Sequence, residues 1–310
     1  MSAAAELIED RGEAAVAEDF FRSRPFLAAE GVTHTLRIEG EGIELLAPLV
    51  VREINDTGER DAISPYGYPG LVGRAPDALD PSAVDFSTTG LVSVFIRHSL
   101  HEPTLAGTTA RNVVQIADPD LPPKSRPSDR RQVRKNIEAG YDLSLVPGIE
   151  TTPAQRAGFL GVYEQTMRRA EAASHYFFDA AYFDRILTAD HTWLALATTP
   201  GGDLAAASIA AVSDGFLHYY LSGSADSHLR DSPMKNIVAL LIEHGAELGL
   251  PLNLGGGISP GDALEEFKRG FANRRETWHT SEIVCDRPAY ERLAAGRDVG
   301  GFFPAYRAAS

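Results

Sequence analysis

A lysine at the edge of an apolar helix face is the group best placed to stabilise a negative charge. The pattern predicts a helix over residues 262–271, in which Leu264, Phe267 and Phe271 form one stripe and Lys268 projects only about 40° from Leu264. A dry environment strengthens the attraction between an ammonium group and an anion. Lys268 is therefore a candidate for stabilising the oxyanion of an acyl transfer. A lysine whose aliphatic chain packs on the apolar face while its ammonium reaches water would also explain this position.

A predicted strand with two polar ring side chains on one face is the second candidate. Over residues 216–221, alternation sends Phe216, His218 and Tyr220 to the same face. His218 and Tyr220 are candidates for relaying the proton of an amine or for orienting an acceptor. For His218, a core histidine with satisfied hydrogen bonds explains the pattern better than a catalytic base does.

Other catalytic classes lack the residues they need. His98 and His101 stand in a strand-to-loop context without a nearby cysteine or paired carboxylates, so no metal site is predicted. No Gly-x-Ser-x-Gly elbow is present for a Ser-His-Asp hydrolase. Cys285 is the single cysteine and cannot form an internal disulfide. With no apolar run long enough for a membrane span and no signal-peptide pattern, a cytoplasmic protein is expected.

Charge separates one basic segment from an otherwise acidic protein. The formal net charge is −14, and an acidic surface repels polyanions. Residues 124–135 are the exception, because they hold six cations against a single carboxylate, that of Asp129. The segment indicates either a local phosphate-binding surface or a solvated linker helix, and the charge run alone slightly favours the linker.

The length of 310 residues exceeds what one hydrophobic core usually organises, so two domains of roughly 150 residues each are expected. Hydrophobic residues at 44% and charged residues at 23% are ordinary for a globular chain. The expected division is a solvated lead-in over residues 1–19, a first domain over 20–140 that ends in a basic linker helix at about 126–140, and a second domain over 141–310.

The order of predicted elements is that of a mixed α/β fold. In the first half, strands are expected at residues 33–38, 43–54, 91–97 and 112–116. In the second half, two helices at about 152–173 and 180–188 precede strands at 193–198, 204–212 and 216–221, followed by a helix at 232–248, a strand at 252–254, a helix at 262–271, a strand at 277–284 and a helix at 288–295.

A loop rich in proline and glycine interrupts the first half. Residues 64–70 read Ser-Pro-Tyr-Gly-Tyr-Pro-Gly, which precludes regular structure. Tyr66 and Tyr68 are aromatic residues that a plain surface turn does not need. The loop is either one that lines a substrate site or one whose tyrosines cover the edge of the core.

Several separated segments resemble the Fem branch of the GNAT superfamily. They are Arg-Arg-Gln-Val-Arg-Lys-Asn-Ile at 130–137, Tyr-Glu-Gln-Thr-Met-Arg-Arg at 163–169 with His-Tyr-Phe at 175–177, His-Tyr-Tyr-Leu-Ser-Gly-Ser at 218–224, and Leu-Gly-Gly-Gly at 254–257 leading into Phe-Lys-Arg-Gly-Phe at 267–271. Each is weak alone, but together they span most of the chain in order. The resemblance implies two tandem GNAT-like domains, each a mixed, mostly antiparallel sheet flanked by helices.

The resemblance also implies an activity. Fem-type enzymes transfer an amino acid from aminoacyl-tRNA to an amine and form an amide bond, with the donor bound at the second domain and the acceptor in a channel between the domains. The acceptors are peptidoglycan precursors or, in relatives from antibiotic and other natural-product pathways, small amines or peptides. No metal or prosthetic group is expected, and the chain is expected to be a monomer or a weak dimer.

Roles for particular residues follow from the resemblance. It places Lys268 near the donor ester, which favours the catalytic interpretation of this lysine; His218 and Tyr220 complete the catalytic candidates. The donor-binding candidates are Phe267, Arg269, Arg168, Tyr176, Arg130, Arg131, Arg134 and Lys135. The acceptor-binding candidates are Tyr66, Tyr68 and Ser222.

Two departures from the cell-wall enzymes concern the partners. The chain has no heptad-rich helical arm, so tRNA would rest on the body, with residues 124–135 as the candidate surface. The family's residues for a nucleotide-linked muropeptide acceptor have no match in the first half, which puts a peptidoglycan substrate in doubt.

The main alternative is a GNAT N-acyltransferase that uses acyl-CoA. GNAT enzymes of that kind resemble one another in a glycine-rich loop whose amides bind the CoA pyrophosphate. The corresponding residues 225–233 contain no glycine, and they include Asp226, Asp231 and Pro233. Two carboxylates and a missing amide favour tRNA over CoA as the donor. A non-catalytic binding protein on the same fold is a third hypothesis, which the presence of Lys268 disfavours.

Overall fold

The computed structural model describes residues 3–259, 261–297 and 299–308. Contacts divide the chain into two compact units, of which unit 1 comprises residues 1–111 with 277–310 and unit 2 comprises residues 112–276. The chain crosses between the units within β8 (Thr109–Ala117) and within β14 (Arg274–Val284). This division differs from the predicted boundary at residue 140, because strand pairing rather than the proline cluster decides it.

Residues on both sides of the predicted boundary belong to unit 2. β8 pairs antiparallel with β13 (Leu252–Gly255), and α2 (Pro127–Glu138) packs against α5 (Met234–Leu248). At the other end, β14 pairs antiparallel with β7 (Leu91–Arg97), which returns the end of the chain to unit 1. The basic helix is therefore part of unit 2 and not a linker.

The first residues of the described chain form a strand instead of the expected solvated lead-in. β1 (Ala3–Ile8) pairs antiparallel with β2 (His34–Gly40). The side chains of Ala3 and Ala5 are buried, whereas Ala4 is exposed between them. An alternation of small apolar residues with exposed ones is the two-residue period of a strand with one face on a core.

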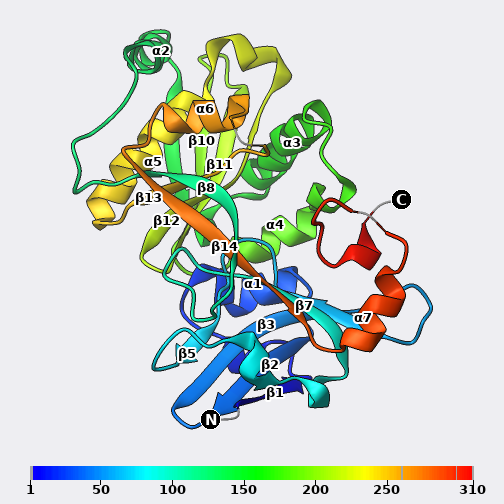
Figure 1. Ribbon diagram of the computed structural model, residues 1–310. Coiled ribbons are helices and arrows are strands. Elements are labelled where there is room, and N and C mark those ends of the chain that lie inside the picture. The colour runs from blue at the N-terminus through cyan, green and yellow to red at the C-terminus, as the bar shows by residue number, and fades with distance from the viewer. Residues whose placement is uncertain (1–2, 260, 298, 309–310) are drawn as a thin grey trace. The chain divides into compact units, whose positions relative to one another are not determined.

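Unit 1 is a mixed, mostly antiparallel sheet (Figure 1). Its strand order is β6-β1-β2-β3-β4-β7-β14, and β5 pairs with β3. The remaining elements are β3 (Ile43–Glu53), β4 (Arg60–Ile63), β5 (Val72–Arg74), β6 (Val84–Asp85), α1 (Arg24–Ala29) and α7 (Arg287–Ala294). Its apolar core includes Leu36, Ile38 and Leu45. Asp61 within β4 is buried and binds Arg52 and Arg307, which fastens the end of the described chain to this sheet.

The part of the sheet that lies in unit 2 is also mixed, and helices pack against it. Its strand order is β8-β13-β12-β11-β10-β9, in which only β12 and β13 run parallel. Besides β8 and β13, its strands are β9 (Asp142–Pro147), β10 (Thr192–Thr198), β11 (Leu204–Ser213) and β12 (Phe216–Ser224). Besides α2 and α5, its helices include α3 (Pro153–Arg169), α4 (Ala180–Ile186) and α6 (Ala263–Arg269). The predicted α/β class, with a mixed, mostly antiparallel sheet flanked by helices, is confirmed.

Two local features that the sequence predicted in unit 2, a helix cap and an apolar helix face, are present in the structure. Thr152 and Gln155 form a reciprocal capping box at the start of α3, with Pro153 in the first turn. The core cluster of the unit joins Ile237, Val238 and Leu241 of α5 to the strands. These are side chains of the apolar face that the helical period predicted.

Candidate functional site

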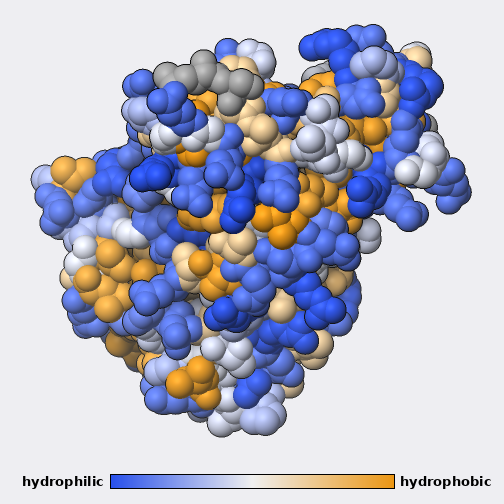
Figure 2. Space-filling model, turned by 90° about the horizontal axis from the view of Figure 1, so that it is seen from below, coloured by the Kyte–Doolittle hydropathy of each residue, from blue (hydrophilic) through white to orange (hydrophobic). Residues whose placement is uncertain are grey.

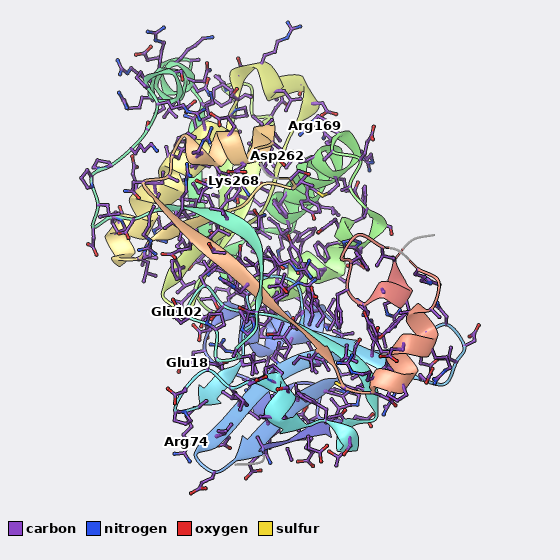
Figure 3. All side chains as sticks on the ribbon, viewed as in Figure 1. Glu18, Arg74, Glu102, Arg169, Asp262 and Lys268 are labelled. Carbon is purple, nitrogen blue, oxygen red and sulfur yellow. The ribbon has the colours of Figure 1, made fainter. Side chains whose placement is uncertain are left out.

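The candidate site begins at α6, which follows three glycines. Asp262 caps the helix, because its carboxylate accepts hydrogen bonds from the amides of Ile258 (2.6 Å), Ser259 (2.9 Å) and Glu265 (2.7 Å). These bonds lower the pKa of the Asp262 carboxyl. Figure 3 shows Asp262 and Lys268 at this helix. The cap fixes the direction of α6, and therefore the direction in which Lys268 extends.

Lys268 is buried, with only 8% of its surface exposed. Its Nζ donates a hydrogen bond of 2.7 Å to the carbonyl oxygen of Gly256. Burial lowers the pKa of the Lys268 ammonium to about 8, while the nearby charge of Asp262 acts in the opposite direction. The side chain is thus a desolvated cation that loses its proton readily above neutral pH.

The predicted apolar stripe of this helix is wrong in one respect. Leu264 is 38% exposed, whereas Lys268 itself lies on the buried face. The projection assumed a regular helix over residues 262–271, but α6 ends at Arg269 and Gly270 forms its cap. Phe271 is buried against the unit 2 core and lies beyond the helix, so one angular step per residue does not apply to it.

The loop at residues 255–257, called the glycine loop below, is shaped by close contacts. Gly255 has a φ of +75°, which favours glycine. A Cβ on Gly256 would lie 2.3 Å from the amide of Asn112, and one on Gly257 would lie 2.5 Å from the carboxylate of Asp262. Asn112 in turn donates a hydrogen bond of 2.9 Å to the Gly257 carbonyl. Glycine is required here so that the loop can approach the groups that hold it.

The two parallel strands beside the glycine loop pair only briefly. β12 and β13 are paired at Leu217 with Leu252 and at His218 with Asn253, and β12 then continues to Ser224. The register of β12 against β11 also shifts near Tyr220, which marks a β-bulge. Bulges are common next to active sites because they change the direction of side chains.

Tyr219 follows directly after His218, the last residue of β12 that is paired with β13, and its ring faces the lysine. The Lys268 Nζ lies 6.0 Å from the centre of the Tyr219 ring, and the Tyr219 hydroxyl is 2.6 Å from that of Ser222. Burial raises the pKa of Tyr219 to about 12, so the phenol stays protonated at neutral pH. Lys268, Tyr219 and Ser222 therefore form one polar group beside the glycine loop, and this group includes the Ser222 predicted from the sequence.

His218 does not share that polar group. It is 1% exposed, and its Nε2 lies 3.1 Å from the carbonyl oxygen of Ser213 while its Nδ1 lies 3.0 Å from the side-chain nitrogen of Asn253. A carbonyl only accepts, so Nε2 carries the proton and Nδ1 accepts from Asn253. Asn253 also accepts a bond of 2.8 Å from the amide of Gly255. His218 thus supports the start of the glycine loop from within the core.

Tyr220 points to a different neighbourhood. Its hydroxyl is 2.8 Å from that of Tyr182 on α4, whereas Tyr219 contacts the lysine. The structure therefore brings Tyr219, which was not among the sequence candidates, to the lysine instead of Tyr220. The bulge in β12 lies at this pair of tyrosines, and sequence alternation alone gives no signal of it.

The remaining donor-binding candidates lie on α6, on α3 and in the turn that follows α3. Phe267 contacts Phe271 with ring centres 5.6 Å apart, and Arg269 pairs with Glu266 of its own helix. Arg168 pairs with Glu164 one turn earlier on α3 at 2.5 Å. The carbonyl of Tyr176 accepts a hydrogen bond of 2.7 Å from Tyr163. A donor-binding role for these residues stays a prediction.

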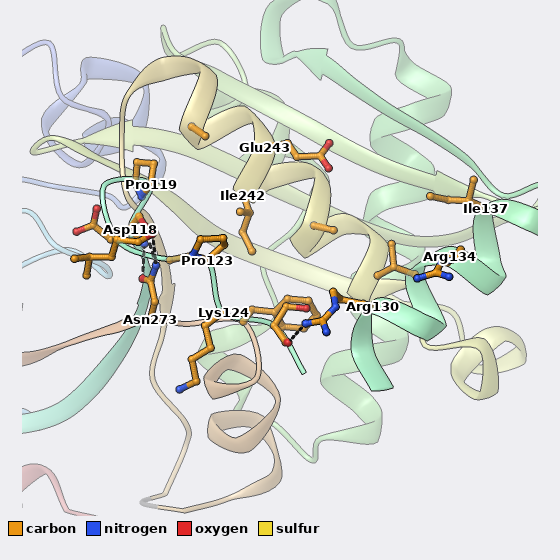
Figure 4. Close-up of a pocket in the computed structure, with 17 residues that line it drawn as sticks. Asp118, Pro119, Pro123, Lys124, Arg130, Arg134, Ile137, Ile242, Glu243 and Asn273 are labelled. Carbon is orange, nitrogen blue, oxygen red and sulfur yellow. Dashed lines mark hydrogen bonds between the residues drawn. The ribbon is translucent and has the colours of Figure 1, made fainter. Parts of the chain in front are cut away.

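The basic helix α2 carries exposed cations next to an apolar pocket (Figure 4). Arg130, Arg131, Arg134 and Lys135 are all exposed. A pocket of about 520 Å³ is lined by Lys124, Arg130 and Arg134 together with aliphatic side chains of α2 and α5. The helix itself is held to α5 through amides, since Asn136 donates to Asn236 at 2.7 Å. The cations are thus available to a phosphate ligand.

Two of the acceptor candidates lie in unit 1. The ring of Tyr68 packs edge-on against Phe21 and Trp278, at 5.5 and 5.7 Å between ring centres. The backbone amide of Tyr66 donates a bond of 2.8 Å to Glu30. Tyr68 therefore covers core aromatic residues, which is one of the two interpretations of this loop. An acceptor role for Tyr66 and Tyr68 stays a prediction.

Comparisons with known proteins agree with this geometry. Residues 123–269 match the family described as Acetyltransferase (GNAT) domain. The matched residues cover most of unit 2 and include α6 with Lys268. No curated protein matches the chain in sequence.

Solved structures extend the likeness beyond unit 2. FemX is 10% identical, with a TM-score of 0.58 over 83% of this chain and 89% of its own. The C-terminal domain of a putative lysylphosphatidylglycerol synthetase from Agrobacterium fabrum is 14% identical, with a TM-score of 0.59 over 90% and 91%. L-PGS from Bacillus licheniformis is 14% identical, with a TM-score of 0.53 over 78% and 82%. The predicted resemblance to Fem-type proteins of the GNAT superfamily is confirmed at the level of the fold.

Two further properties of the described residues concern membrane spans and metal-binding clusters. No helix among them is long and apolar enough to span a bilayer, and on the face seen in Figure 2 hydrophilic residues surround separate apolar patches. No cluster of three or more histidine, cysteine, aspartate or glutamate residues suited to a metal ion occurs in the same ranges. His98, considered for metal binding, instead lies 2.8 Å from the hydroxyl of Ser281.

Proposed function

We propose that this protein is an aminoacyltransferase that moves an amino acid from aminoacyl-tRNA to the amine of a peptide, a small molecule or a peptidoglycan precursor. The observation that carries the proposal is the buried ammonium of Lys268 beside the glycine loop, where β12 and β13 stop pairing. A desolvated cation at a strand opening is suited to an oxyanion that develops during acyl transfer.

The reaction needs little beyond positioning and one cation. The neutral amine attacks the ester carbonyl, a C–N bond forms, and the negative charge on the carbonyl oxygen is stabilised by Lys268. The C–O bond to the ribose then breaks, and the ribose oxygen takes the proton that the amine releases. The ester is already activated, so the mechanism includes no covalent enzyme intermediate. We propose no metal or prosthetic group for this chemistry.

The start of α5 favours tRNA over CoA as the donor. A CoA pyrophosphate at this position would meet two carboxylates, of which Asp226 pairs with Arg169 and Asp231 accepts a bond of 2.9 Å from Tyr141. The carbonyl of Asp231 is also covered, because the side chains of Gln132 and Asn136 donate to it at 3.0 and 2.8 Å. The segment before the helix holds two paired carboxylates and no glycine, unlike a pyrophosphate-binding loop.

The exposed cations of α2 provide the RNA contact in this proposal. Arg131 and Lys135 lie one helical turn apart, and Arg130 and Arg134 form a second row that lines the pocket. Phosphate contacts of this kind depend on salt and carry no sequence information. They fix the position of the tRNA body while its 3′ end reaches the lysine.

The choice of donor is tested directly. Purified protein is incubated either with charged tRNA or with acetyl-CoA, plus a panel of primary amines, and amide products are measured with and without RNase. Product from charged tRNA that RNase abolishes is expected. Product that depends on CoA and is insensitive to RNase would show that the protein is an acyl-CoA-dependent N-acyltransferase.

The lowered pKa of Lys268 predicts how the rate depends on pH. The ammonium predominates below a pH of about 8 and is lost as the pH rises through that value. The acceptor should be a weakly basic amine that is neutral over the whole pH range of the measurement. With it, kcat/KM should be constant below a pH of about 8 and fall above it. A Lys268→Arg protein with measurable activity should lack the descending limb, because guanidinium stays charged. A flat or rising profile in the wild type contradicts the ammonium role.

A further inference from the structure

The pocket between α2 and α5 is walled mainly by apolar side chains. Val133 of α2, Ala239 and Ile242 of α5, and Phe271 beyond α6 all line its volume of about 520 Å³. Figure 4 shows Ile242 on α5 beside the charged residues of the same pocket. Pockets of this size commonly hold small organic ligands, and a few polar groups at such a pocket orient the ligand. The walls and these polar groups therefore indicate which ligand fits.

Two large aliphatic side chains of this pocket are exposed. Leu121, before α2, is 41% exposed, and Ile137, near the end of α2, is 54% exposed. Both line one hollow, so they are not scattered surface residues. Exposed apolar side chains gathered in a hollow with a polar rim are typical of a binding surface. Contacts to RNA phosphates do not account for them, because such contacts are made by polar groups.

The amide and one carboxylate at the wall of the pocket are already used within the protein. Asn273 Nδ2 donates a hydrogen bond of 2.8 Å to the Asp118 carbonyl, and its Oδ1 accepts one of 2.8 Å from the Asp118 amide. The Asp118 carboxylate pairs with Arg274. A nucleobase has polar edges that need partners once they are buried, whereas an alkyl chain needs none. The wall therefore favours an alkyl chain over a base.

Positive charge at the pocket defines the other end of the ligand. Lys124, Arg130 and Arg134 line it, and Glu243 is the one lining carboxylate without a cation partner among the described residues. Arg130 and Arg134 lie one helical turn apart, and the Arg130 guanidinium donates a hydrogen bond to the Ser125 carbonyl. Guanidinium groups bind carboxylates and phosphates through charge-assisted hydrogen bonds. A chain with an anionic head group fits both the walls and the charge.

We infer that this pocket binds a single alkyl chain with an anionic head group, for which a fatty acid is the simplest case. The chain lies between α2 and α5, and the head group pairs with Arg130 and Arg134. The inference goes beyond the proposed function, because it assigns a second ligand to the body of unit 2. Arg131 and Lys135 do not line the pocket, so they remain available to RNA while the pocket is occupied.

Calorimetric titration of the whole protein with monomeric dodecanoate tests the inference. Dodecanoate should bind on the order of tenfold more tightly than decanoate, because two further methylene groups leave water. Adenosine monophosphate, which offers an anion and a base, should bind more weakly than dodecanoate. The formal net charge of −14 opposes unspecific binding of an anion to other surfaces. Equal affinities for the two chain lengths, or tighter binding of adenosine monophosphate, overturns the inference.

Single substitutions of charged residues locate the head group. Arg134→Gln should weaken dodecanoate binding about tenfold, since it removes a charge-assisted hydrogen bond. The matched control Arg131→Gln removes the same charge from the same helix outside the pocket, so the affinity should stay within about twofold of the wild type. Glu243→Gln should strengthen binding, because it removes a carboxylate that repels the head group. If both arginine variants bind equally well, the head group does not lie at the pocket and the inference is wrong.

Two tryptophan substitutions on α5 locate the alkyl chain. Ala246 lines the pocket and is exposed, so Ala246→Trp should fill the space and abolish dodecanoate binding. Leu248 is exposed near the same helix end but does not line the pocket, so Leu248→Trp should keep the wild-type affinity. Both variants should melt within about 2 °C of the wild type, as surface substitutions usually do. Unchanged binding by Ala246→Trp places the chain elsewhere and contradicts the inference. Failure of the proposed function appears separately, as transfer that is insensitive to RNase.

Discussion

Lys268→Met is expected to transfer acyl groups about 10²- to 10³-fold more slowly than the wild type, the loss typical of removing one oxyanion-stabilising donor. The loss should appear in kcat measured under single-turnover conditions. Folding should not suffer, because the ammonium is buried and its pKa is lowered from 10.5 to about 8 by desolvation. An uncharged side chain of similar length avoids that cost, so the variant should melt at the same temperature as the wild type or above it.

A second lysine provides the control. Lys124 is exposed and lines the pocket beside α2. Lys124→Met should raise KM for charged tRNA by removing one phosphate contact and leave kcat unchanged. If Lys268→Met retains the wild-type kcat, the buried ammonium is not part of the chemistry and the mechanism is wrong.

Gly223→Ala should cause the largest loss of stability among single methyl additions in unit 2. A Cβ at this position of β12 would lie 2.4 Å from the carbonyl oxygen of Val162 and 2.5 Å from the amide nitrogen of Tyr163, both in the backbone of α3. Backbone atoms cannot rotate away, so the helix must move off the sheet. We expect the free energy of unfolding to fall by about 3 kcal/mol in urea titrations, at the upper end of overpacking effects. Transfer activity should fall as well, because β12 carries Tyr219.

Gly161 on the same helix supplies the matched control. It is exposed, and a Cβ there would meet nothing within 4 Å. Gly161→Ala should therefore raise the free energy of unfolding by about 0.5–1 kcal/mol, the usual gain from alanine inside a helix. Equal stability of the two variants would mean that α3 and β12 are not in close contact.

The sequence predicted the individual helices and strands better than it predicted which of them belong to the same unit. Local signals such as the capping box at Thr152 and the apolar face of α5 depend only on neighbouring residues, and both are present. The unit boundary depends on which strands pair, and β14 returns to β7 through contacts between distant residues. The strand at Ala3 was also missed, because the run of alanines and the glutamate that open it have weak strand propensity until a partner strand covers them.

The candidate site was predicted only in part, because strand pairing also decides where some of its residues lie. Lys268 could be selected from its place beside apolar residues and from the family resemblance, and its burial agrees with that choice. The supporting residues Asn112 and Asn253 could not, because their positions depend on the register of β8 and β13. Tyr219 was passed over in favour of Tyr220 because a bulge changes side-chain direction without a sequence signal.

The division of unit 1 into two stretches of chain affects the order in which the protein can fold on the ribosome. β7 is paired with β4 from the outset, but its second neighbour, β14, is synthesised only after all of residues 112–276. Until then one edge of β7 is an open template on which other nascent chains can add a strand. Rapid folding of unit 2 shortens that exposure, so a destabilising substitution in unit 2 should cause aggregation that begins in unit 1.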